Sequence, residues 1–175
     1  MVLATPASAF TLHNFSTGLC LTVAAGKPDP GADMVMWTCD GSPSQQWGWG
    51  APGQAWPGQS MAALLNYYFS GVAVNRVIGV RDGQGIWEDG VPLIDWFKKP
   101  DVNQLWQAFF VWNDVNGHEC YYFRNGNNLK SAPKVMGVFA ADKGKGAPVV
   151  IWDLILNAKG KPDRAGHPDQ YWCVY

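Results

Sequence analysis

Three tryptophans in matching positions are the residues of this sequence best suited to bind a ligand. Trp37, Trp96 and Trp152 each end a heptapeptide that has Gly first, a small residue second and an aliphatic residue fifth. An indole ring offers a flat apolar face that can cover the C–H side of a ring-shaped ligand. The pattern predicts stacking at one or more of these rings, and the alternative is that they pack beneath their own loops.

The residues that could perform acid–base or nucleophilic chemistry form no recognisable constellation. His13, His118 and His167 are isolated, and none has a local partner of the kind found in nucleophilic motifs. Glu88 and Glu119 are the only glutamates, and no spacing selects the opposed carboxylates that a glycosidase needs. We therefore expect a protein that is not an enzyme.

Charge and composition exclude several other classes. The net charge is −1 with no cluster of Lys or Arg, which argues against a nucleic-acid partner. No stretch approaches the roughly 18 apolar residues of a membrane-spanning helix, so we expect no membrane insertion. The sequence has no phosphate-binding glycine loop, Cys-x-x-Cys motif or histidine cluster, so we expect no cofactor and no metal.

A second motif recurs after each of these heptapeptides. It is Gln-x-Trp, at Gln45–Trp47, Gln104–Trp106 and Gln170–Trp172. The Gln lies eight residues after the heptapeptide Trp in repeats one and two and eighteen residues after it in repeat three. Repeat three therefore carries an insertion, and the chain consists of three related units that must share one core.

The segments between these motifs predict an all-β protein. They are short, rich in β-branched and aromatic residues, and separated by turns drawn from the 20 Gly and 12 Pro of the chain. We expect four strands in each repeat, and a single domain over residues 10–175 with repeats at about 10–58, 59–115 and 116–175. Residues 1–9 are interpreted as an N-terminal tail or signal-peptide remnant, because Ala7-Ser8-Ala9 has the small-x-small form of a cleavage site.

Together these motifs resemble the ricin B-type (R-type) β-trefoil lectin family. Gly18-Leu19-Cys20-Leu21, Met36-Trp37-Thr38-Cys39 and Gln45-Gln46-Trp47 are close to the family pattern, as is Val80-Arg81-Asp82-Gly83. The resemblance covers residues 10–175 and implies a β-trefoil that binds glycans or glycoproteins. It also implies structural roles for the Gln and Trp of each Gln-x-Trp: Gln45, Trp47, Gln104, Trp106, Gln170 and Trp172.

The resemblance places a sugar site in each repeat, built from an acidic residue, an aromatic residue and an amide. A carboxylate accepts hydrogen bonds from sugar hydroxyls, and an amide both donates and accepts. Here the aromatic is present three times, whereas the acidic position holds Thr22, Gly79 and Gly137. Nearby carboxylates, Asp33, Asp82, Asp95 or Asp153, could substitute from another direction. The predicted carbohydrate-binding residues are Trp37, Thr22, Ser44, Trp96, Asn103, Asp95, Trp152, Asp153 and Asp169.

Four cysteines allow three pairings. The resemblance implies a Cys20–Cys39 disulfide, which leaves Cys120 and Cys173 on strands that are neighbours in a trefoil barrel. Two disulfides would indicate a secreted, extracellular protein, and the alternative is four buried thiols in a reducing compartment.

Two functions remain open. A lectin with shallow sites would gain strength through multivalency, for example as a homodimer. A protease inhibitor or other protein-binding module would instead use the loops at Trp49–Gln59 and Ile155–Pro168. The segment Asn14-Phe15-Ser16 is an N-glycosylation sequon on an expected turn.

Overall fold

The computed structural model describes residues 9–24, 30–56, 59–66, 76–83, 88–127 and 133–175, with side chains left aside at 51–60. Nearly all of the expected N-terminal tail lies outside these residues. The described chain holds twelve strands, four to each repeat, and the all-β expectation is confirmed. None of its helical turns has the length needed to cross a membrane.

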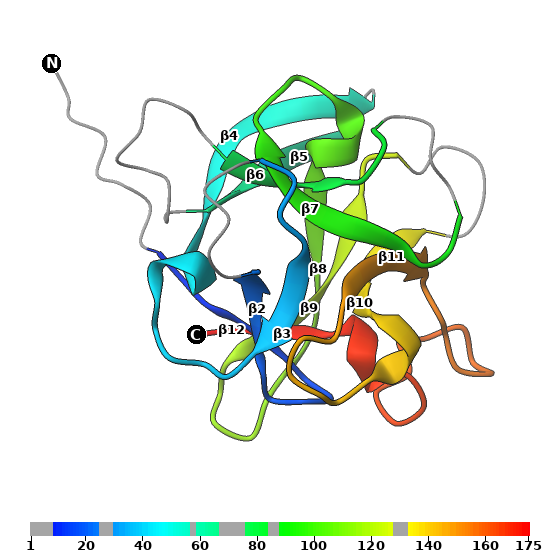
Figure 1. Cartoon of the computed structure of the whole chain (residues 1–175). Coiled ribbons are helices and arrows are strands. Elements are labelled where there is room, and N and C mark those ends of the chain that lie inside the picture. Colours follow the sequence, from blue (N-terminus) through cyan, green and yellow to red (C-terminus); the bar gives the residue numbers. More distant parts are fainter. Residues whose placement is uncertain (1–8, 25–29, 57–58, 67–75, 84–87, 128–132) are drawn as a thin grey trace, which may run out of the picture.

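Six of the strands close a barrel (Figure 1). They are the first and fourth strands of each repeat: β1 (Leu12–Asn14), β4 (Trp47–Trp56), β5 (Gln59–Asn66), β8 (Trp106–Asn113), β9 (Glu119–Asn125) and β12 (Trp172–Val174). Antiparallel pairings run β1–β12–β9–β8–β5–β4, and the bridge between Phe10 and Trp47 returns the sheet to its start. Closure leaves the barrel strands without an unpaired edge along the ring.

The second and third strands of each repeat form hairpins that cap one end of the barrel. They are β2 (Cys20–Val23) with β3 (Met34–Trp37), β6 (Arg76–Val80) with β7 (Val91–Phe97), and β10 (Lys134–Val138) with β11 (Val149–Asp153). Backbone bridges at Asp33–Ile94, Val35–Pro148 and Val150–Pro92 join the three hairpins in a triangle. This barrel and cap form the β-trefoil that the sequence predicted.

The Gln-x-Trp motifs connect barrel to cap by the same contacts in every repeat. The indoles of Trp47, Trp106 and Trp172 are fully buried, and each donates its N–H to a carbonyl of its own hairpin at 3.0–3.1 Å. The glutamines lie in short 3-10 turns, Pro43–Gln45, Val102–Gln104 and Pro168–Gln170. Their side chains both donate and accept hydrogen bonds with backbone groups, at Thr38 and Asp40, Phe97 and Lys99, and Asp153 and Ile155.

A buried asparagine at the end of each repeat's first strand joins one repeat to the preceding one. Asn14, Asn66 and Asn125 each donate to the two carbonyls that flank a Gln of Gln-x-Trp. These bonds hold the 3-10 turns that carry Ser44, Asn103 and Asp169. Since the Asn14 side chain is 1% exposed and already hydrogen-bonded, the sequon is not accessible in the folded protein.

Both cysteine pairs are disulfides. Cys20–Cys39 ties β2 to the end of β3, and Cys120–Cys173 joins β9 to β12 across the barrel wall. The second pair confirms that the first and fourth strands of repeat three are neighbours.

The two expected contact loops are more ordered than a loop description implies. Residues 49–56 belong to β4 and pair with β5 with two shifts of register, and residues 57–58 of the expected loop lie outside the described part of the chain. The repeat-three insertion is anchored by Arg164, whose guanidinium lies 4.8 Å from the ring centre of Phe15 and 5.3 Å from that of Trp112. Cation–π packing of this kind fixes the insertion against the barrel.

Candidate functional site

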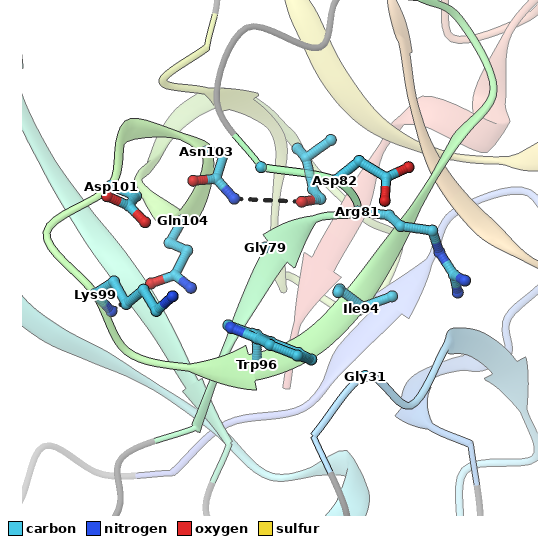
Figure 2. A pocket seen from close by; sticks show the side chains of 12 residues that line it. Gly31, Gly79, Arg81, Asp82, Ile94, Trp96, Lys99, Asp101, Asn103 and Gln104 are labelled. Atoms are coloured by element: carbon cyan, nitrogen blue, oxygen red, sulfur yellow. Dashed lines mark hydrogen bonds between the residues drawn. The ribbon is translucent and has the colours of Figure 1, made fainter.

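Among the described residues, hollows lie beside two of the heptapeptide tryptophans, and the larger belongs to repeat two. It has a volume of about 410 Å³ and lies between hairpin β6–β7 and the 3-10 turn Val102–Gln104. Trp96 and Asn103, the aromatic and amide predicted for this repeat, both line it. Figure 2 shows the two side chains on either side of Gly79.

Trp96 is held with part of its ring exposed. It lies near the end of β7, and a Cβ on Gly31 would come within 3.3 Å of the ring, so the repeat-one backbone packs directly against it. Gly31 has a backbone φ of +101°, a conformation that residues other than glycine rarely adopt. A glycine here permits the contact that orients the indole.

The acidic position of repeat two is filled from the neighbouring turn. A Cβ on Gly79 would meet Gln104 Cγ at 3.1 Å and Asn103 Nδ2 at 3.5 Å. Gln104 cannot easily move, because its amide bonds to the backbone of Phe97 and Lys99. A carboxylate side chain at this residue, where the family pattern places one, would therefore crowd Gln104 and require the turn to shift.

Asn103 carries an unsatisfied acceptor in the lining of the hollow. The side chain is 5% exposed, and its Nδ2 donates to the Val80 carbonyl at 3.2 Å. Only the amide nitrogen can donate to a carbonyl, which fixes the orientation of the amide. Its Oδ1 is buried and accepts no hydrogen bond from the described residues. A buried polar atom without a partner costs free energy, so a ligand that donates to it is favoured.

Charged groups of both signs surround the rim. Asp82 and Lys99 line the hollow and are exposed, and Asp82 has a positive φ of 65° in the turn after β6. Arg81 forms an ion pair with Asp33 across the boundary with repeat one. The rim is therefore a mixed surface suited to a polar, uncharged ligand.

Asp95 lies outside this hollow, which differs from the sequence expectation. Neighbouring residues of a strand point to opposite faces, so Asp95 points away from the face that carries Trp96. It is 1% exposed and accepts a hydrogen bond from Arg76 Nε at 2.8 Å. Burial raises the pKa of this carboxyl, and Arg76 offsets part of that rise. Its role is an internal ion pair.

Repeat three has a smaller hollow of about 240 Å³, lined by Trp152, Asp169 and His167. Asp169 approaches the vacant acidic position, because a Cβ on Gly137 would lie 3.7 Å from its Oδ2. Burial raises the pKa of Asp169, and a backbone hydrogen bond and His167 oppose the shift. This hollow thus has a carboxylate that enters from the turn instead of from the strand.

Asp153 belongs to a different contact in repeat three. Lys134 Nζ lies 2.7 Å from Asp153 Oδ1 and 2.5 Å from Asp89 Oδ1, so the carboxylate is part of an ion-pair network. It does not line the repeat-three hollow.

In repeat one the predicted residues do not converge in the same way. Trp37 is 45% exposed, with Lys145 Nζ 5.9 Å from its ring centre. Thr22 is buried, where its hydroxyl donates to Cys20 and accepts from Gln45. Ser44 Oγ bonds to Ser42 Oγ at 2.9 Å. Both predicted hydroxyls are therefore engaged in internal hydrogen bonds, and Trp37 is an exposed ring.

His13, Cys20 and Cys39 come together, but they do not form a metal site. Both sulfurs belong to the same disulfide and carry no thiolate that could coordinate an ion.

Comparison with known proteins identifies the family of the chain. The sequence model of the ricin-type beta-trefoil lectin domain-like family matches residues 3–96, more than half of the chain. The protein belongs to this family. No curated protein matches the sequence.

Solved structures similar to this lectin-like domain share its fold. The designed three-fold symmetric protein ThreeFoil superposes with a TM-score of 0.67 at 17% identity, covering 95% of this chain and 96% of that one. A ricin B-like lectin from Macrolepiota procera, solved in complex with lactose, gives 0.58 at 13% identity, covering 99% and 98%. An exo-beta-1,3-galactanase from Clostridium thermocellum gives 0.67 at 24% identity, and the match covers 99% of this chain but 31% of the enzyme.

Proposed function

We propose that the protein is a carbohydrate-binding lectin whose principal site is the repeat-two hollow. The observation that carries the proposal is the buried, unpaired Oδ1 of Asn103 beside the half-exposed face of Trp96. A pyranose supplies a partner for each of these groups: its apolar C–H face covers the indole, and its hydroxyls donate to Asn103 Oδ1. Membership of the lectin-like family and the sugar complexes among its structural neighbours support the proposal.

The proposed binding mode differs from the one that the family pattern implies. The sugar ring stacks on Trp96, and one hydroxyl donates to Asn103 Oδ1. Other hydroxyls accept from Lys99 and donate to Asp82 at the rim, which supply the charge-assisted hydrogen bonds that a residue at position 79 would otherwise provide. The repeat-three hollow, with Trp152 and Asp169, is a second and smaller site of the same kind.

The protein would act by binding alone, in an oxidising extracellular setting. Its family and fold are those of lectins, and its two disulfides are of a kind that persists outside reducing compartments. A single shallow site binds weakly, so a homodimer or presentation on a larger assembly would be needed for strong attachment to a glycan surface.

A glycan array with the oxidised protein tests the proposal. We expect selective binding to one class of terminal neutral sugar, abolished by the free monosaccharide in excess. A blank array with folded protein would contradict carbohydrate binding and would favour a protein partner held by the loops.

A further inference from the structure

The barrel has a second hollow of about 450 Å³ that no sugar-site pattern predicts. Residues of β4, β8, β9 and β12 line it, together with Phe10, which bridges to β4. None of its lining residues comes from the cap hairpins, so it is separate from the hollows of repeats two and three.

The repeat pattern explains why this hollow exists. Trp49, Ala108 and Val174 each lie two residues after the core Trp of a Gln-x-Trp motif. Residues two apart on a strand share a face, so all three point into the barrel below the core. One of them is large and the other two are small, and the missing volume opens a space beside Trp49.

Four aromatic rings form a continuous wall of this hollow. Ring centres are separated by 6.3 Å from Phe10 to Trp49, 6.0 Å from Trp49 to Phe123, and 6.3 Å from Phe123 to Tyr121. Trp49 is 36% exposed although it packs against core residues. The ring faces carry partial negative charge from their π electrons.

The charge at this hollow is negative. Glu119 is exposed and is the charged residue of the lining, which contains no Lys, Arg or His. Its Oε2 accepts a hydrogen bond of 2.5 Å from the Tyr121 hydroxyl. Burial and this bond raise the pKa of Tyr121 to about 12, which keeps the phenol a neutral donor. The second carboxylate oxygen of Glu119 forms no hydrogen bond with the described residues.

We propose that this barrel-mouth site, formed by Phe10, Trp49, Glu119 and Tyr121, binds a small alkylated ammonium ion. Aromatic faces attract such cations, and their methyl groups are apolar enough to fill a hollow that a hydrated ammonium would not enter. The carboxylate of Glu119 supplies the opposite charge. An anionic ligand is disfavoured by the same carboxylate, and a neutral apolar ligand would leave its charge uncompensated.

Titration with choline, followed by NMR of protein carrying ¹⁵N-labelled tryptophan, tests the proposal. The indole signal of Trp49 is assigned by its loss in Trp49→Phe. We expect that signal to shift in a saturable way with a Kd of about 1 mM, as suits a ligand of this size. The neutral isostere 3,3-dimethylbutan-1-ol should bind at least about fivefold more weakly, since it has the same shape without the charge.

Glu119→Gln provides the second arm and should weaken choline binding about threefold to fivefold, the usual effect of a partly exposed charge pair. Glu88→Gln is the matched control, because Glu88 does not line the hollow, and it should leave the Kd unchanged. If choline and its neutral isostere bound equally well, or if Glu119→Gln left the Kd for choline unchanged, the hollow would be an apolar cavity without a preference for cations. Either result would overturn the proposal. An unshifted Trp49 signal, or a shift confined to other indoles, would also overturn the proposal.

Discussion

The Asn103 side chain donates from Nδ2 to the Val80 carbonyl at 3.2 Å, and this contact sets the chemistry of the repeat-two hollow. Because the nitrogen is engaged with the strand, the oxygen is the atom left for a ligand. Asn103 is 5% exposed to solvent, so its oxygen is an acceptor held in a fixed position, whereas an exposed carboxylate would be mobile. A ligand hydroxyl that donates to Asn103 Oδ1 therefore does not have to displace a strong hydrogen bond to water.

Replacement of this amide should weaken sugar binding. Asn103→Ala is expected to reduce affinity about threefold to tenfold, the value of one hydrogen bond to a neutral acceptor. Calorimetric titration with the sugar selected on the array measures the change. Asn113→Ala, at an exposed end of β8, is the control and should bind like the unmodified protein. Full affinity in a folded Asn103→Ala protein would remove Asn103 from the site.

Any side chain introduced at Gly79 should lower the stability of the fold. Gly79→Ala places a Cβ 3.1 Å from Gln104 Cγ, and we expect a loss of about 1–3 kcal/mol in the free energy of unfolding, the cost of overpacking. Urea denaturation measures it. Gly144→Ala is the control, since its contact at 3.2 Å is with the movable end of the exposed Asp142 side chain, and it should change stability by less than about 0.5 kcal/mol. If Gly79→Ala left the free energy of unfolding unchanged, the turn that carries Gln104 would have room to move.

Asp95 should matter for stability through Arg76. Arg76→Met leaves a buried carboxylate without its cation and should cost about 3–5 kcal/mol of unfolding free energy. The double variant Arg76→Met/Asp95→Leu removes both charges and should recover most of that loss. A double-mutant cycle by urea denaturation gives the coupling. Additive effects of the two substitutions would contradict a coupled internal pair.

The Asp114 carboxylate should make stability depend on pH in the acid range. The Tyr175 hydroxyl, 2.6 Å away, and the backbone N–H groups of His118 and Asn116 hold its pKa well below the usual 3.8. A depressed pKa in the folded state adds stability above pH 3.8, and that stability is lost as the pH falls further.

The melting temperature measured against pH checks this effect. Asp114→Asn should melt below the unmodified protein at neutral pH, and the difference should shrink steadily as the pH falls below about 4. Asp142→Asn, which replaces an exposed aspartate in another turn, is the control. A difference that stays constant down to pH 2 would assign the effect of Asp114→Asn to the turn backbone and not to the charge.

Much of the fold could be predicted because the same contacts recur in all three repeats. The three Gln-x-Trp motifs recur with the three Trp-ending strands, and each indole makes the same hydrogen bond to its own hairpin. The disulfide between Cys120 and Cys173 followed once their strands were known to be barrel neighbours. Local spacing was enough for the motifs, whereas the cysteine pairing depended on the family resemblance.

The site was less predictable because its chemistry depends on contacts between distant segments. Asp95 was expected beside Trp96, although alternation along β7 already places the two on opposite faces. Its partner Arg76 lies on another strand, and nothing in the spacing of charges selected that pair. The role of Asn125 had a signal in the sequence, an Asn at the same place in each repeat, but its acceptors lie in the preceding repeat.

Gly79 illustrates the remaining difficulty. The sequence shows that the acidic residue is missing, but only the packing of Gln104 against this glycine shows that a side chain here would be crowded. The insertion in repeat three was recognised by its length, whereas its anchor, Arg164 on Phe15 and Trp112, joins three parts of the chain far apart in sequence.

The most direct test of carbohydrate binding in repeat two is a sugar titration of three matched variants, Trp37→Ala, Trp96→Ala and Trp152→Ala. We predict that Trp96→Ala loses most of the affinity, about tenfold or more, since it removes the stacking surface. Trp37→Ala should bind as the unmodified protein does, and Trp152→Ala should lose only a weaker second site. Unchanged binding in a folded Trp96→Ala protein would contradict the assignment of the principal site to repeat two.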